Sequence, residues 1–183
     1  LGVSLDDDDA AIRQAMEEGE RKYGQSAVDT RDAAFKRWFG DSKVVDAQGK
    51  PLVVYHGTAV EFDAFSKDAG AKHIDLPGFF FTPDQGIADN FAASASRKPV
   101  RDADGYIVSY EGARVEPVYL SVQDPIEINL DDRETGKMTG ASEVRRMLEA
   151  AQAAGHDGAI IRGWADGSGD TQYVAFEPTQ IKS

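Results

Sequence analysis

Cysteine is absent from the sequence, which excludes a disulfide framework, a thiol nucleophile and a cysteine-type zinc site. Long apolar runs are also absent, and none approaches the roughly 20 residues that a membrane-spanning helix needs. Basic residues are few: 20 Lys and Arg stand against 32 Asp and Glu, which leaves a net charge of −12. Such a chain repels phosphate backbones and anionic lipids at long range, so extensive duplex binding and membrane docking are not expected.

The composition is that of one globular domain. A chain of 183 residues with 41% hydrophobic and 9% aromatic residues can bury a core and is too apolar to be disordered throughout. No signal peptide is visible after Leu1, and we expect the sequence to be a piece of a longer polypeptide. The acidic run at residues 6–9 lies in an interval, residues 1–29, that we interpret as a helical leader or linker, with residues 30–183 as the main domain.

The apolar pattern predicts many short strands and a few helices. A helix over residues 30–39 is predicted, with Thr30 or Asp32 as its cap and Gly40 at its end. Further helices are predicted over residues 83–94 and 141–154, and strands over residues 52–55, 79–81, 106–110, 115–122, 126–128, 159–162 and 173–176. The strand spacing is too irregular for a repeated βαβ array, so the sequence predicts an α+β fold.

Several kinds of enzyme motif are missing. The three histidines, His56, His73 and His156, form no H-x-x-x-H pair, so no metal site is expected. The glycines at residues 166–170 match neither a Walker loop nor a dinucleotide fingerprint. A G-x-S-x-G nucleophile elbow is also lacking, which leaves serine-type catalysis without support.

Three patterns stand in order along the chain: Y-H-G-T at residues 55–58, G-F-F-F-T and then D-N-F-A within residues 78–92, and Q-Y-V-A-F at residues 172–176. Together they resemble the ADP-ribosyltransferase superfamily of the diphtheria-toxin and poly(ADP-ribose) polymerase type. Its signature is a His on one strand, a Tyr on a second and a Glu, sometimes Asp or Gln, at the head of a third. The run over residues 35–58 and the ending at residues 173–183 are especially similar to such domains in phage and mobile-element polyvalent proteins.

The resemblance implies a split β-sandwich of two small mixed or antiparallel sheets with surrounding helices and NAD⁺ in the cleft between the sheets. It implies that His56 hydrogen-bonds ribose hydroxyls of NAD⁺, and that Gly57 offers its backbone N–H and C=O to the nicotinamide carboxamide. Thr58 matches a hydroxyl near the nicotinamide ribose. Tyr55 and Gly78 belong to the same motifs and are assigned to the NAD⁺ site with them.

Two phenylalanines take the places of aromatic residues of the family. Phe80 stands where the signature Tyr is found, and Phe91 stands where the polymerase-type enzymes have a second Tyr. The resemblance implies that the two rings sandwich nicotinamide, and Phe supplies such stacking without a phenol hydroxyl. Phe79, Phe80, Phe81 and Phe91 include core residues as well, because neighbouring strand residues point to opposite faces.

Gln172 stands where the family has its catalytic Glu, and we assign the catalytic set as His56, Phe80 and Gln172. The amide oxygen of a Gln can accept a hydrogen bond from the ribose 2′-OH, but it brings no negative charge and cannot act as a base. Three interpretations stay open: a native Gln variant that transfers to an already nucleophilic acceptor, an inactivating Glu→Gln change, and a catalytically inactive NAD⁺-binding module.

The loop that precedes Gln172 corresponds to a turn that helps choose the acceptor in toxin-like relatives. We assign Trp164 and Asp170 to this acceptor loop. For Trp164 the alternative is packing beneath the loop. If Trp164 contacts the acceptor, Trp164→Ala should reduce acceptor modification and leave NAD⁺ hydrolysis unchanged.

The leading hypothesis is a mono-ADP-ribosyltransferase that cleaves NAD⁺ at the nicotinamide glycosidic bond and modifies a macromolecule, expected to be a protein rather than a nucleic acid. The alternatives are an NAD⁺ glycohydrolase, an inactive NAD⁺-binding module, and the RNA 2′-phosphotransferase branch of the fold, for which basic residues are scarce. We expect no metal and no membrane partner. We also expect a monomeric domain within a larger polypeptide, acting in the cytosol of a bacterial host or target cell.

Overall fold

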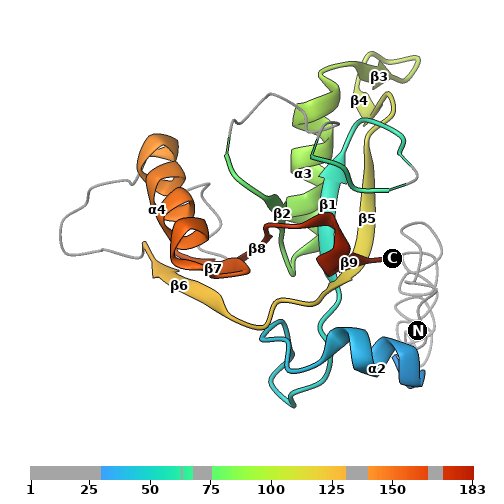
Figure 1. Ribbon diagram of the computed structural model, residues 1–183. Helices are drawn as coiled ribbons and strands as arrows, with labels where there is room; N and C mark the ends of the chain where they lie inside the picture. Colours follow the sequence, from blue (N-terminus) through green and yellow to red (C-terminus); the bar gives the residue numbers. More distant parts are fainter. Residues whose placement is uncertain (1–29, 63, 68–75, 131–139, 165–170) are drawn as a thin grey trace, which may run out of the picture.

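The computed structural model describes residues 30–62, 64–67, 76–130, 140–164 and 171–183, so the interval at residues 1–29 lies outside the described residues (Figure 1). The described helices are α2 (Ala33–Phe39), α3 (Gln85–Ser96) and α4 (Ala141–Ala154), with a 3₁₀ turn, η1, at Pro178–Gln180. The strands are β1 (Val54–Thr58), β2 (Phe79–Phe81), β3 (Pro99–Arg101), β4 (Ile107–Tyr110), β5 (Arg114–Leu120), β6 (Pro125–Asn129), β7 (Gly158–Arg162), β8 (Gln172–Ala175) and β9 (Ile181–Lys182).

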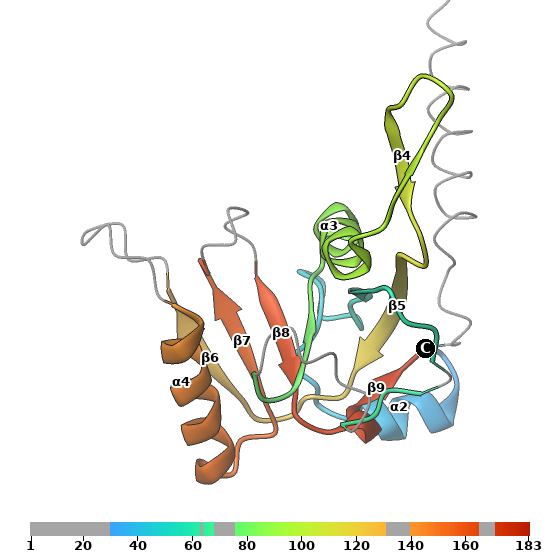
Figure 2. The ribbon, with the colours of Figure 1, turned by 90° about the horizontal axis from the view of Figure 1, so that it is seen from above.

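The strands form two main sheets and one hairpin. The first sheet has the order β1-β5-β9 and the second the order β2-β8-β7-β6, while β3 and β4 form a hairpin that projects beyond both sheets (Figure 2). Neighbouring strands are antiparallel except β6 and β7, which are parallel and are joined through α4. The structure confirms the predicted α+β class, and it adds this one βαβ unit, which the irregular strand spacing did not predict.

Capping residues set the helix ends. The Asp32 side chain accepts hydrogen bonds from the first-turn N–H groups of α2, and Gly40 ends that helix with a positive φ of 54°. The helix α4 has the predicted bounds and ends at Gly155, which is left-handed with a φ of 94°. The helix α3 begins later than predicted because Asp84 is its N-cap and accepts from Ile87 N.

The described strands differ from the predicted ones in extent, in order along the chain and by one strand that was not predicted. The predicted strand over residues 52–55 was expected to end at His56, whereas β1 continues through Gly57 to Thr58, because its pairing with β5 overrides the low strand propensity of glycine. The strand at Gln172 was expected to be the last one, but β9 follows it and is too short to give a sequence pattern. The strand β3 was not predicted at all, since Pro99 disfavours a strand.

The second sheet separates two parts of the core. On one face, Phe80 and Val174 belong to a cluster with α4. On the other face, Phe79 and Phe81 belong to a cluster with Val54 and other residues of the first sheet. The predicted alternation of the three phenylalanines is therefore confirmed, and Phe80 faces away from its two neighbours.

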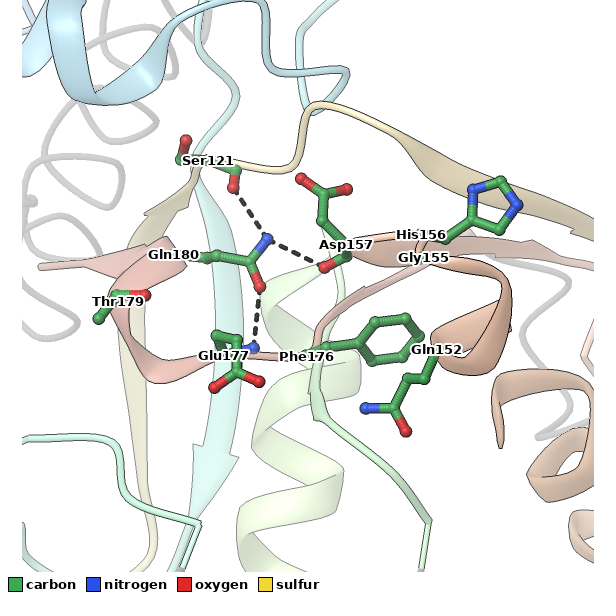
Figure 3. A pocket seen from close by; sticks show the side chains of 9 residues that line it. All are labelled: Ser121, Gln152, Gly155, His156, Asp157, Phe176, Glu177, Thr179 and Gln180. Atoms are coloured by element: carbon green, nitrogen blue, oxygen red, sulfur yellow. Dashed lines mark hydrogen bonds between the residues drawn. The ribbon is translucent and has the colours of Figure 1, made fainter. Parts of the chain in front are cut away.

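Two of the chain crossings between the two sheets, from β5 to β6 and from β8 to β9, meet at one polar network (Figure 3). Gln180 lies at its centre: its Nε2 donates to Ser121 O at 3.0 Å and to Asp157 O at 2.9 Å, and its Oε1 accepts from Glu177 N at 2.8 Å. Ser121 belongs to the crossing from β5 to β6, and Glu177 to the crossing from β8 to β9. The network thereby fixes how the two sheets are joined, and it gives the C-terminal E-P-T-Q motif a structural role.

Gln180→Ala is expected to lower the free energy of unfolding by about 2 kcal/mol, because it removes the donor of the partly buried Ser121 carbonyl and leaves the Asp157 carbonyl only the longer bond from Phe176 N, at 3.4 Å. A loss of this size lowers the melting temperature by roughly 4–8 °C for a chain of this length. Thr179→Ala is the matched control, since the Thr179 side chain is exposed and its carbonyl, not its hydroxyl, accepts from Trp38. Thermal denaturation of both variants checks the prediction, and equal melting temperatures would contradict it.

Candidate active site

The candidate site lies where β1 of the first sheet meets β2 of the second (Figure 1). Among the described residues one bridge joins these strands: Tyr55 N donates to Thr82 O at 2.8 Å, and Thr82 N donates to Tyr55 O at 3.0 Å. If this antiparallel ladder continued by two residues, Gly57 would face Phe80 and the two would exchange the next pair of hydrogen bonds. That pair is not formed, so the ladder opens between Gly57 and Phe80.

At this opening the His56 side chain forms a hydrogen bond with the Phe80 carbonyl. His56 Nδ1 lies 2.9 Å from Phe80 O, and because a carbonyl oxygen only accepts, Nδ1 donates the proton. The neutral ring then presents Nε2 as an acceptor. The N–H and C=O of Gly57 point to the same strand edge as those of Tyr55, two residues earlier, and are therefore directed at the opening.

The His56 ring lies among phenylalanines. Its centroid is 5.3 Å from that of Phe65, 5.5 Å from that of Phe81 and 6.5 Å from that of Phe62. Desolvation by burial lowers the pKa of His56 below 6.5, and it outweighs the opposing effects of the Phe80 carbonyl and the Glu116 charge. The imidazole is therefore held in its neutral form at neutral pH.

This lowered pKa predicts a pH-dependent stability. Between the folded-state pKa and the unfolded value of about 6.5, the unfolded chain binds more protons, so stability is lost as the pH falls through that window. We expect the melting temperature to fall on acidification below about pH 6.5, and to fall less steeply in His56→Gln. Thermal denaturation across this pH range checks the prediction, and the same slope in His56→Gln would contradict it.

Two glycines of the motifs are needed for close packing. A Cβ atom on Gly57 would lie 2.0 Å from Ala88 O and 2.8 Å from Ala92 N, both in the backbone of α3. Gly78 has a φ of +91°, and a Cβ atom there would lie 2.7 Å from the Val174 side chain. The sequence predicted the absence of a side chain at Gly57 for the approach of a ligand, and the structure shows that the approach of a helix requires it as well.

Thr58 is buried at the end of β1, on the same strand face as His56. Its Oγ1 accepts from Val60 N at 3.1 Å and lies 3.3 Å from Val60 O, so the hydroxyl stabilises the turn that follows the strand. A contact between Thr58 and the nicotinamide ribose stays a prediction.

Four of the predicted residues share one face of the opened edge. Tyr55 and Gly57 alternate with His56 along β1 and point to the side of α3. Gln172 is the first residue of β8, and it alternates with Tyr173 to lie on the same face as Val174 and its cross-strand partner Phe80. Gln172 is 5% exposed. By the register of the bridge between Tyr55 and Thr82, Gly57 and Phe80 point to the same side, and Phe80 and Gln172 share one face of the second sheet, while His56 points to the other side.

The Phe80 ring contacts Trp164, with centroids 6.1 Å apart and planes tilted by 49°. Trp164 is the second residue after β7 and packs against the same cluster as Phe80. Its packing corresponds to the alternative considered for this residue, and the contact with Phe80 was not predicted. An acceptor contact of Trp164 stays a prediction.

Phe91 and Asp170 are the two predicted residues that remain. Phe91 lies in α3 and is 40% exposed, and within the described chain no ring contact joins it to Phe80. A ring sandwich therefore needs a ligand between them or a movement of one ring, and the role of Phe91 stays a prediction. Asp170 lies outside the described residues.

Sequence reasoning missed the residues that surround His56 from the loop after β1 and from β5. Phe62 and Phe65 lie three residues apart after the Y-H-G-T motif, and this spacing of two aromatic residues was the signal available. Glu116 is the β5 partner of His56, and its Oε1 lies 2.9 Å from Arg114 Nε. The place of Glu116 opposite His56 depends on the register of β1 and β5, which the sequence alone does not show.

Two cavities among the described residues do not coincide with the opened edge. The larger one, about 420 Å³, lies beside Gln180 at the other end of β8, where its polar groups serve the network between the sheets (Figure 3). The smaller one, about 300 Å³, is lined by Phe62, Phe65 and Glu116 among others, and so it borders the surroundings of His56. We place the site at the opened edge because the chemistry-bearing groups converge there.

The described residues were also searched for other kinds of site. They contain no group of three or more His, Asp or Glu side chains that could hold a metal ion. None of the described helices has the length and apolarity that crossing a membrane requires.

Comparison with known proteins adds one match. The model of a family described as "ADP-Ribosyltransferase in polyvalent proteins" matches residues 46–183, which is more than half of the chain. The matched segment runs from before β1 to the C-terminal residue and includes His56, Gly57, Phe80 and Gln172. No curated protein matches the chain.

Proposed function

We propose, since the chain belongs to the family of ADP-ribosyltransferases in polyvalent proteins, that it cleaves NAD⁺ at the nicotinamide glycosidic bond and transfers one ADP-ribose to a protein acceptor. The reaction of the family uses NAD⁺ as its substrate. The observation that carries the proposal is the ladder that opens between Gly57 and Phe80, with Gln172 on the same face and His56 bonded to the Phe80 carbonyl.

The opened edge suits a planar carboxamide. Gly57 directs one donor and one acceptor at the opening, and a carboxamide offers the complementary acceptor and donor. Phe80 lies opposite Gly57 in the strand register, and its ring can stack on the nicotinamide ring. Such stacking between aromatic rings contributes roughly 0.5–1.5 kcal/mol. Phe91, exposed on the neighbouring helix, is our candidate for the second ring.

The reaction breaks the bond between the ribose C1′ and the nicotinamide nitrogen. The bonding electron pair leaves with nicotinamide, which departs neutral from a cationic ring, and the positive charge develops on the ribosyl group. The acceptor nucleophile then forms the new bond to C1′ and loses its proton to solvent or to a base of the acceptor. Catalysis therefore consists of holding NAD⁺ and stabilising the ribosyl cation, which requires no general acid.

In the proposed complex, His56 and Gln172 form hydrogen bonds with ribose hydroxyls of NAD⁺. His56 Nε2, an acceptor in the tautomer fixed by Phe80, would accept from a ribose hydroxyl. The amide oxygen of Gln172 would accept from the 2′-OH of the nicotinamide ribose. Because an amide cannot take up a proton as a base, we propose transfer of a single unit to a nucleophilic side chain rather than growth of a polymer.

The experiment uses NAD⁺ labelled in its ADP-ribose part, mixed with the chain and a bacterial lysate. We expect nicotinamide release by mass spectrometry together with label that protease removes and nuclease does not. Release without labelled macromolecule would identify a glycohydrolase, and NAD⁺ binding without release would identify a binding module. Absence of both release and binding would overturn the proposal. His156→Ala, at the other end of the second sheet, is the control for His56→Ala, which should lose release.

From the contact between Trp164 and Phe80 we expect Trp164→Ala to affect the KM for NAD⁺ and the labelling of the acceptor to different extents. We expect the KM for NAD⁺ to rise about threefold, because one ring contact that supports Phe80 is lost. Acceptor labelling should fall further, by about tenfold, if Trp164 also contacts the acceptor. Parallel assays of nicotinamide release and labelling measure both effects. Equal losses in the two assays would restrict Trp164 to supporting Phe80.

The proposed acceptor class rests on the charge of the chain, and the proposed place of action rests on the family resemblance. The net charge of −12 favours a protein acceptor over a nucleic acid. The proposed place of action is the cytosol of a bacterial cell, where proteins of phages and mobile elements act.

A further inference from the structure

The ring of Phe65 is the centre of an aromatic cluster beside His56. Its centroid lies 5.3 Å from that of His56, 4.8 Å from that of Phe62, 5.6 Å from that of Phe79 and 5.7 Å from that of Phe81. Phe79 and Phe81 belong to β2, whereas His56 belongs to β1. Phe65 therefore contacts both strands at the place where their ladder opens.

One hydrogen bond does not fix the orientation of an imidazole. The bond from His56 Nδ1 to Phe80 O fixes one atom of the ring, about which the plane can still pivot. Phe65 meets that plane nearly edge-on, at 72°, and Phe81 meets it at 51°. The two rings together define the plane in which Nε2 lies.

Glu116 and Arg114, two residues of β5, are the charged groups near His56 that the structure pairs with each other. Glu116 faces His56 across the strand pair, and its carboxylate lies beside the Arg114 guanidinium at 2.9 Å. Arg114 also approaches Glu61 at 3.6 Å and lies over the Phe62 ring at 5.9 Å from its centroid. Arg114 pairs with Glu116, whose charge is the smallest of the effects on the His56 pKa, so the phenylalanine rings form most of the surroundings of the imidazole.

We infer that Phe65 is a positioning residue of the NAD⁺ site, which holds the His56 ring so that Nε2 stays directed at the ribose hydroxyl. The inference rests on the proposed function for its ligand. It assigns a role to the second aromatic residue of the pair at positions 62 and 65, to which neither the family signature nor the motifs gave one.

The test observes the ring of His56 directly. In a chain with ¹⁵N-labelled histidine, NMR reports the tautomer and the ring order of His56 without any ligand. We expect one tautomer, protonated at Nδ1, with an ordered ring in the wild-type chain and in Phe65→Tyr, and a ring of clearly lower order in Phe65→Ala. Phe65→Leu keeps much of the volume but not the ring, so it replaces Phe65→Ala if that variant does not fold. Phe39→Ala, which removes a buried ring from the α2 cluster, is the matched control and should leave the His56 signals unchanged.

Calorimetry with NAD⁺ adds the functional readout. We expect the Kd for NAD⁺ to rise about tenfold in Phe65→Ala, to return to within about threefold in Phe65→Tyr, and to stay unchanged in Phe39→Ala. Unchanged His56 signals in a folded Phe65→Ala, or an equal change in Phe39→Ala, would overturn the inference. Lack of NAD⁺ binding by the wild-type chain would instead count against the proposed function, while the His56 signals still decide the role of Phe65.

Discussion

Gln172→Glu is expected to raise the rate of nicotinamide release from NAD⁺ by about 10²–10³-fold, the range associated with one electrostatic group placed at a developing charge. Gln172 is 5% exposed and heads β8 on the face that carries Phe80. A carboxylate there would lie beside the ribosyl cation, whereas the amide offers only a dipole. The two side chains have nearly the same shape, so the fold should be retained.

Because position 172 is buried, the gain in the rate of nicotinamide release from Gln172→Glu should depend on pH. A carboxyl group at a buried position has a raised pKa, and only its ionised form stabilises the cation, so the gain in rate should increase as the pH rises. Gln152→Glu, on the exposed face of α4, is the matched control and should leave the rate unchanged. Nicotinamide release from both variants and the wild-type chain measures the effect. Equal rates in the wild-type chain and Gln172→Glu would contradict the prediction and would make the native Gln172 a fully effective catalytic residue.

Gly57→Ala is expected to abolish measurable NAD⁺ binding and to lower the free energy of unfolding by about 3 kcal/mol. The added Cβ would lie 2.0 Å from Ala88 O and 2.8 Å from Ala92 N. Both are backbone atoms of a helix, so no side-chain rotation relieves the overlap, and β1 or α3 must shift. Either shift displaces the Gly57 amide from the opened edge, where the proposed carboxamide contact is made.

Thermal denaturation and calorimetry with NAD⁺ measure the two effects of Gly57→Ala. The melting temperature should fall by roughly 6–12 °C for a chain of this length. Gly140→Ala is the matched control, because a Cβ atom at Gly140 meets nothing within 4 Å and its φ is −78°. Equal melting temperatures and equal NAD⁺ affinities in the two variants would show that the close approach to α3 is not required.

The sequence predicted those parts of the site that depend on local pattern. A strand period of two sends Phe80 away from Phe79 and Phe81, and the structure confirms that alternation. The helix α4 was predicted to its last residue because Gly155 ends it in a left-handed conformation. The match of the family over residues 46–183 agrees with the resemblance stated from the motifs.

The parts that the sequence did not predict depend on how distant strands meet. The bond from His56 to the Phe80 carbonyl joins residues 24 positions apart, and it exists because β1 and β2 diverge after one bridge. No local pattern contains that divergence. The close approach of α3 to Gly57 and the position of Phe65 also follow from packing between elements, which residue spacing along one element does not specify.

In the proposed complex, the opening between Gly57 and Phe80 holds the nicotinamide end of NAD⁺. Titration of the ¹⁵N-labelled chain with NAD⁺, followed by NMR of the backbone amides and the Gln172 side-chain amide, observes this contact. We expect the largest shifts at Gly57, Phe80 and the Gln172 amide, and we expect nicotinamide alone to reproduce the shift at Gly57. Saturable NAD⁺ binding with these signals unmoved, or with the largest shifts around Gln180 at the other end of β8, would contradict it.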